Sequence, residues 1–129
     1  MRAVDTNVIL RFLIGDDPRQ AKVAERCVAD GIFVSHGVLM EAEWVMRAGY
    51  RLNPTQIADL LSDLLEIACV EVDDREELRW AIERHRQGAD WADLLHLIAC
   101  RAQPAFATFD RTLAREAGPN APVSIELLT

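Results

Sequence analysis

Short apolar runs alternate along the chain with longer segments whose apolar residues recur at helical spacing. Five of the short runs have the length and residue types of strands: residues 3–4, 32–34, 69–72, 105–108 and 123–127. The clearest helical pattern follows Asn53-Pro54, where five apolar residues share one helix face: Ile57, Leu60, Leu61, Leu64 and Leu65. Strands that alternate with helices predict βαβ units, and therefore an α/β fold with a mostly parallel sheet.

Length and composition place the chain among compact globular proteins. Its 129 residues suit a single domain over residues 1–129, and 50% of them are hydrophobic. No apolar run approaches the ~18 residues that a membrane helix needs, and the N-terminus lacks the features of a signal peptide. The cysteines form no CxxC pair, so we expect reduced, buried thiols in a cytoplasmic protein.

The chain is acidic, with a net charge of −7 and a pI of about 4.9. A negative molecule disfavours loose, non-specific binding of nucleic acid. It does not exclude an enzyme that acts on nucleic acid, because a bound metal ion can neutralise a local site.

Four acidic residues occupy unusual places in this pattern. Asp5 follows the first strand, and Asp110 comes two residues after the fourth. Asp93 lies in the first turn of the most apolar helix. Glu41 lies in or beside the apolar stripe of the helix after the second strand, which we expect to consist of Val38, Ala42 and Val45. In a parallel sheet with right-handed crossovers, strand ends and the following helix starts share one edge. We therefore expect these four carboxylates to meet at that edge.

Each of these acids also has a simpler interpretation. Asp5, Asp90 and Asp110 stand where helix N-caps stand, and Asp93 in a first turn is favoured by the helix dipole. Glu41 could reach water from the edge of its helix. Taken together, however, the four positions are hard to explain by capping, and four close carboxylates would repel one another. Because Mg²⁺ and Mn²⁺ prefer oxygen ligands, we predict a divalent-metal site.

Four segments of the chain resemble the acidic motifs of PIN-domain ribonucleases, and among these the VapC-type toxins of bacterial toxin–antitoxin pairs. In chain order they are Asp5-Thr6-Asn7, Val38-Leu39-Met40-Glu41-Ala42-Glu43-Trp44-Val45-Met46-Arg47, Asp90-Trp91-Ala92-Asp93 and Thr108-Phe109-Asp110. The resemblance implies a PIN-like three-layer α/β/α fold, with a five-stranded, mostly parallel sheet flanked by helices. It also implies a Mg²⁺ or Mn²⁺ cofactor, hydrolysis of RNA phosphodiester bonds, a homodimer and inhibition by a cognate antitoxin. One departure is Trp91, where a smaller aromatic residue is more usual.

By position in these motifs, the resemblance implies a catalytic quartet that consists of Asp5, Glu41, Asp93 and Asp110. Asp5 and Asp93 would hold the metal, Glu41 would act through water or accept a proton, and Asp110 would orient the ligands. Three accessory residues lie beside the quartet: Thr6, Asp90 and Thr108. Arginines near these segments could bind RNA phosphates, although surface ion pairing is their simpler role: Arg11, Arg47 and Arg111, with Arg51 and Arg115 as further candidates.

Further expectations concern side chains outside the quartet. Glu43 and Arg47 are four residues apart on a helix, which predicts a surface ion pair. His96, on an apolar helix, is interpreted as a core histidine with its hydrogen bonds satisfied. The apolar helix over residues 54–66, with the helices around Arg11 and Arg47, offers more apolar surface than a small domain needs. We therefore expect a homodimer and a groove for an antitoxin helix that carries aromatic and Arg anchors.

Two non-catalytic functions are alternatives on the sequence alone. A phosphoacceptor receiver domain also has acids at strand ends, but it needs paired acids after the first strand and a Lys after a late one. Here Asp5 is followed by Thr6 and Asn7, and residues 105–110 contain no Lys. Asn7 also disfavours a phosphatase of the Asp-x-Asp type. The second alternative is a PIN-like domain that only binds a partner, and the presence of all four acids counts against it.

Overall fold

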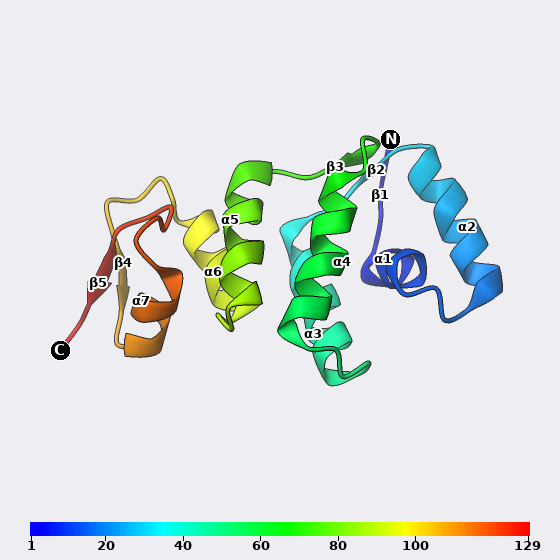
Figure 1. Ribbon diagram of the computed structural model, residues 1–129. Coiled ribbons are helices and arrows are strands. Elements are labelled where there is room, and N and C mark those ends of the chain that lie inside the picture. The colour runs from blue at the N-terminus through cyan, green and yellow to red at the C-terminus, as the bar shows by residue number, and fades with distance from the viewer. The chain divides into compact units, whose positions relative to one another are not determined.

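The computed structural model describes residues Met1–Thr129, which form two compact units, Met1–Asp73 and Asp74–Thr129 (Figure 1). The predicted α/β class is confirmed, because helices and short strands alternate and every strand pair is parallel. All five predicted strands are present, but they form a three-stranded and a two-stranded sheet in place of the single sheet that we expected. The single domain expected over residues 1–129 stays a prediction.

The first unit contains one parallel sheet and four helices. Its elements are β1 (Arg2–Ala3), α1 (Thr6–Leu13), α2 (Pro18–Ala29), β2 (Ile32–Phe33), α3 (His36–Ala48), α4 (Pro54–Glu66) and β3 (Val70–Glu71). The strand order is β1-β2-β3, with Ile32 opposite both Arg2 and Val70. Parallel neighbours need a crossover connection. Here α1 and α2 make the first crossover, and α3 and α4 make the second.

Helix α4 begins and ends where the sequence predicts, and α2 begins at an N-cap followed by Pro in the same way. The side chain of Asp17 accepts a hydrogen bond from the Gln20 backbone N–H at 3.1 Å, and Pro18 fills the first helical position. A capping box starts α4, where the side chain of Asn53 and that of Gln56 each accept a hydrogen bond from the other's backbone N–H. The apolar face of α4 is buried within the protein, and its buried residues are Ile57, Ala58, Leu61, Leu64 and Leu65.

The buried face of α3 differs from the one that we predicted. We expected an apolar stripe of Val38, Ala42 and Val45, whereas the buried residues are Leu39, Ala42, Glu43 and Met46. The helix is thus rotated by about one residue, which corresponds to roughly 100°. The predicted pair is present, because Arg47 Nε donates to Glu43 Oε2 at 2.9 Å. Its placement on the surface was wrong for Glu43, which is only 4% exposed.

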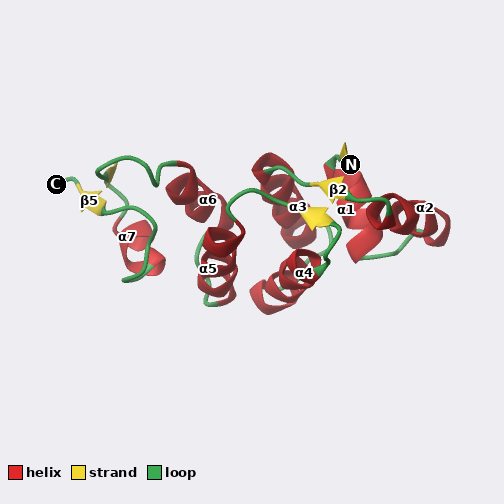
Figure 2. Cartoon of the chain, turned by 90° about the horizontal axis from the view of Figure 1, so that it is seen from above, coloured by secondary structure: helices red, strands yellow, loops and turns green.

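The second unit contains the two remaining strands and three helices. Its elements are α5 (Arg75–Arg86), α6 (Trp91–Ala99), β4 (Phe106–Thr108), α7 (Arg111–Ala117) and β5 (Ile125–Leu127) (Figure 2). Strands β4 and β5 are parallel, with Phe106 opposite Ile125. The core of this unit joins α6, α7 and the segment before β5 through Leu97, Leu113, Ala117 and Val123. This core fixes where α6 and α7 begin, and therefore where the acids at those helix starts lie.

The histidine in the core of the second unit is His85 and not His96. His85 is 4% exposed, and its Nδ1–H donates to the Ala89 carbonyl oxygen at 2.8 Å. Its ring meets that of Trp91 edge to face, with the ring centroids 5.6 Å apart. The expectation for His96 was wrong: the residue is exposed, because the rest of α6 buries its apolar faces and leaves His96 toward solvent. The bulky Trp91 is accommodated, since it is 2% exposed.

Two further expectations concern the cysteines and membranes. Cys27, Cys69 and Cys100 are free thiols, as predicted, but each is half-buried and none is fully buried. No helix in the structure is long and apolar enough to span a bilayer.

Candidate active site

Asp5 lies between the end of β1 and the start of α1, as the sequence predicts. Its backbone is extended, and its Oδ1 accepts a hydrogen bond from the Val8 backbone N–H at 3.2 Å. Asp5 is therefore the N-cap of α1, so the simpler interpretation is correct as far as it goes. Its Oδ2 carries no hydrogen bond and the residue is exposed. Capping thus occupies one oxygen and leaves the other available to a ligand.

Thr6 connects this segment to Glu41 on α3. The Thr6 hydroxyl, on a residue only 7% exposed, donates a hydrogen bond to Glu41 Oε1. Glu41 is exposed at the edge of α3, and its Oε2 makes no hydrogen bond. Asp5, Thr6 and Glu41 line one hollow of about 280 Å³ together with Asn7. Two of the four predicted acids therefore share a solvent-accessible hollow in the first unit, and a buried hydroxyl orients one of them.

Asp90 and Asp93 lie at the start of α6 in the second unit. Asp90 is the N-cap, and its Oδ1 accepts a hydrogen bond from the Asp93 backbone N–H at 3.0 Å. The side chain of Asp93 is half-buried and accepts no hydrogen bond. The pKa of the Asp93 carboxyl is raised, first by its burial and then by the negative charges of Asp90 and Asp110, with Glu116 adding to the effect and His96 opposing it.

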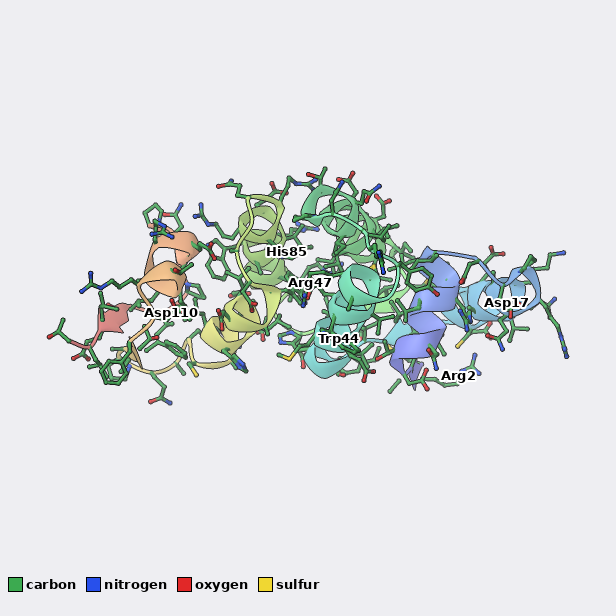
Figure 3. The ribbon with its side chains drawn as sticks, turned by 90° about the horizontal axis from the view of Figure 1, so that it is seen from below. Arg2, Asp17, Trp44, Arg47, His85 and Asp110 are labelled. Atoms are coloured by element: carbon green, nitrogen blue, oxygen red, sulfur yellow. The ribbon has the colours of Figure 1, made fainter.

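Asp110 lies at the start of α7, where it caps the helix (Figure 3). Its Oδ1 accepts hydrogen bonds from the backbone N–H groups of Thr112 at 2.9 Å and Leu113 at 3.2 Å. Thr108, the last residue of β4, accepts a hydrogen bond from the Asp110 backbone N–H through its Oγ1 at 2.9 Å. Thr108 thus sets the turn that presents Asp110. The Oδ2 of Asp110 carries no hydrogen bond, and the residue is exposed.

The arginines proposed for phosphate binding differ in whether other side chains of the protein already bind them. Arg11 binds Asp16 at 3.2 Å and Gln20 at 2.6 Å, and Arg47 binds Glu43. Ion pairing, the simpler role, is therefore confirmed for both of them. Arg111 is exposed and makes no hydrogen bond or ion pair, which leaves its guanidinium available to a substrate.

The residues present fit a hard divalent cation by the chemistry of their donor atoms. All four predicted acids offer carboxylate oxygens, which are the ligands that Mg²⁺ and Mn²⁺ prefer. The pKa of Asp93 is raised first by burial and then by the neighbouring carboxylates, and a bound cation would favour the charged carboxylate against both effects. Neither unit by itself gathers three or more His, Cys, Asp or Glu side chains into a metal-binding group.

A protein-family model described as PIN domain matches residues 2–119, which covers elements of both units and all four predicted acids. Comparison with curated proteins and with solved structures gave no match. The PIN domain is a nuclease-type fold, and enzymes of this kind generally depend on divalent metal ions.

Proposed function

The chain belongs to the PIN domain family, and from that premise we propose that it is a metal-dependent endoribonuclease that serves as the toxin of a toxin–antitoxin pair. One observation carries the proposal of a nuclease site. Each of the four acids keeps at least one carboxylate oxygen without a hydrogen bond, although Asp5, Glu41 and Asp110 are all fixed through their other oxygen. Capping accounts for Asp5 and Asp110, but Glu41 lies inside α3 and Asp93 is not the N-cap of α6, so capping does not explain the carboxylates at all four motif positions.

In this proposal Asp5 and Asp93, by their positions in the family's motifs, would be the ligands of a Mg²⁺ or Mn²⁺ ion. When bound, the cation lowers the pKa of a water molecule and stabilises negative charge on the phosphate oxygens. Asp93 suits this role because its raised pKa reflects burial and like charges that a positive ion would offset. Asp110 orients the ligands from the outer shell, and Asp90 adds further negative charge beside Asp93.

Glu41 is the proposed proton acceptor. The hydroxyl of Thr6 donates a hydrogen bond to one oxygen of Glu41, and this bond fixes the orientation of the carboxylate and of its other oxygen. Water attacks the phosphorus, the bond from phosphorus to the 3′-oxygen breaks, and the proton of the water passes to Glu41. The departing 3′-oxygen takes a proton from solvent. The products carry a 5′-phosphate and a 3′-hydroxyl. Arg111 is available to bind a flanking phosphate because no carboxylate engages it.

The proposed partners are an antitoxin and a second copy of the chain. The apolar face of α4, which we expected to contribute to a dimer, is buried within the protein. The support for a protein interface therefore comes from α3, where Trp44 is 58% exposed and lies beside Arg47. Large aromatic side chains are common anchors of protein interfaces. Light scattering should give the mass of a dimer for the wild type and a 14.5 kDa monomer for Trp44→Arg. A monomeric wild type at micromolar concentration would rule out the homodimer.

A cleavage assay on RNA tests the proposed activity. The wild type should cut a labelled RNA with Mn²⁺ and should not cut it with EDTA. Asp5→Asn should lose activity by orders of magnitude, because the change removes a charged ligand and retains the shape of the cap. Asp63→Asn is the matched control, since Asp63 is an exposed carboxylate on α4 outside the site. No cleavage by the wild type would favour a PIN-like domain that only binds a partner. Equal cleavage by the two variants would exclude Asp5 from the site.

A further inference from the structure

A second hollow in the first unit lies between α1 and α2, and the chemistry above does not use it. Its volume is about 550 Å³. Asn7 lines this hollow and also the hollow that contains Asp5 and Glu41. The two hollows therefore have Asn7 as a common lining residue.

The charged residues of this α1–α2 pocket favour a negatively charged ligand. Three guanidinium groups line it, those of Arg2, Arg11 and Arg19, against the single carboxylate of Asp17. Asp30 binds Arg2 at 3.3 Å and Asp16 binds Arg11 at 3.2 Å, which leaves several guanidinium N–H groups unused. Arg19 is exposed and makes no hydrogen bond or ion pair. This density of arginine is notable in a chain whose net charge is −7.

The same pocket has an apolar side. Val23 on α2 is 58% exposed, and Val8 on α1 and the half-buried Cys27 on α2 also line the pocket. Figure 3 labels Arg2 and Asp17, which lie on β1 and at the start of α2 and mark the elements that border the pocket. A nucleotide presents both a phosphate and a flat, weakly polar base, so it matches a wall that combines guanidinium and apolar groups.

We propose that the α1–α2 pocket binds the unpaired RNA segment next to the scissile phosphate. Arg19 binds a phosphate of that segment, and Val23 and Cys27 contact a base or ribose. The segment is single-stranded because only unpaired bases expose their faces to apolar side chains. An antitoxin segment with Arg anchors fits this pocket less well, since it would meet three guanidinium groups. The inference rests on the proposed ribonuclease function and assigns Arg19 a role in positioning the substrate.

The kinetic test compares Arg19→Ala with Arg26→Ala. Both arginines are exposed on α2, but Arg26 does not line the pocket. We expect Arg19→Ala to raise KM on the order of tenfold with kcat retained, because a charge-assisted contact to phosphate is lost. The slope of log KM against log salt concentration should become shallower by about one. Arg26→Ala should match the wild type in both measurements. Equal KM values and salt slopes for the two variants would overturn the proposal.

A binding experiment separates this proposal from the proposed activity. Fluorescence anisotropy of a labelled single-stranded RNA with EDTA present needs no cleavage, and affinity should fall for Arg19→Ala only. Bound RNA should also protect Cys27 from alkylation and leave the rate at Cys69 unchanged. RNA that binds through Arg19 and is not cut with Mn²⁺ would refute the nuclease alone. RNA that is cut without protection of Cys27 would refute the pocket alone. A labelled acidic peptide that binds more tightly than RNA, and loses affinity only in Arg19→Ala, would assign the pocket to a protein segment.

Discussion

The hydroxyl of Thr6, at the start of α1, donates a hydrogen bond to the carboxylate of Glu41, which lies 35 residues further along the chain on α3. Thr6 is 7% exposed, whereas Glu41 is exposed. A buried donor thus fixes one oxygen of an acid that otherwise faces solvent. This relationship gives Glu41 a defined orientation before any substrate binds, which a proton acceptor requires.

Thr6→Val tests whether this orientation matters. The change keeps the shape of the buried side chain and removes the hydroxyl, so the fold should be retained. We expect kcat to fall about tenfold, which corresponds to ~1.4 kcal/mol of transition-state stabilisation. Thr6→Ser should restore most of the activity because it restores the donor. Rates of RNA cleavage at saturating substrate, with unfolding curves for each variant, check the prediction. Equal rates for the Val and Ser variants would show that the hydrogen bond is only structural.

Asp93→Asn should separate stability from activity. The carboxyl of Asp93 has a raised pKa, so its negative charge is unfavourable in the folded protein without metal. Its side chain accepts no hydrogen bond that Asn would lose. We therefore expect the free energy of unfolding of the metal-free protein to stay level or rise, while RNA cleavage falls by several orders of magnitude. If Asp93 served only the helix dipole, the change would cost about 0.3–1 kcal/mol and leave cleavage intact.

The pH dependence of stability gives an independent measure of the same residue. The pKa of Asp93 in the folded protein lies above its ordinary value of 3.8. At a pH between these two pKa values, the folded state therefore binds the proton more tightly than the unfolded state does. The contribution of Asp93 to stability is therefore present below 3.8 and is lost as pH rises through the folded-state pKa. Urea unfolding of the metal-free wild type and of Asp93→Asn over this range should show the loss in the wild type only. Parallel curves would mean that the pKa of Asp93 is not raised in the folded protein.

Divalent metal should stabilise the folded protein. An ion that binds only the folded state adds about 2.7 kcal/mol to the free energy of unfolding at a hundred times its Kd. We expect Mn²⁺ to raise the melting temperature of the wild type and EDTA to reverse the rise. Asp5→Asn should reduce the effect of Mn²⁺, and Asp63→Asn should not. Melting curves that do not change with Mn²⁺ would contradict a metal site made by the quartet.

Glu43→Gln should lower the stability of the folded protein without changing its rate of RNA cleavage. Glu43 is 4% exposed and accepts a hydrogen bond from Arg47 at 2.9 Å, so the loss of its charge weakens an ion pair whose carboxylate is buried, although the Arg47 side chain is 53% exposed. We expect a loss on the order of 1–2 kcal/mol in the free energy of unfolding, with kcat unchanged. Glu76→Gln is the control, because it alters an exposed pair with Arg79 at 3.1 Å that contributes ~0.5 kcal/mol or less. Equal stability losses in the two variants would show that the burial of Glu43 carries no energetic weight.

The elements themselves were readable from the sequence because local rules determine them. The Asn53 cap and the apolar spacing over Pro54–Glu66 define α4, and Asp17-Pro18 defines the start of α2. The places of Asp5 and Asp110 between a strand and a helix follow from the same local pattern. The simpler interpretation of Asp5, Asp90 and Asp110 as caps was also local, and their hydrogen bonds confirm it.

Tertiary packing decided which face of each element is buried. Glu41 and Glu43 are two residues apart on α3, and a rotation of about 100° exchanges which of them faces the interior. The apolar residues of α3 allow either rotation, so only its neighbours select the one that buries Glu43 and leaves Glu41 exposed. The same holds for His85 and His96, because the elements that pack against a helix determine which of its polar residues are buried and which remain exposed. The division of five short strands into two sheets was likewise not local, since strand pairing joins residues far apart in the chain.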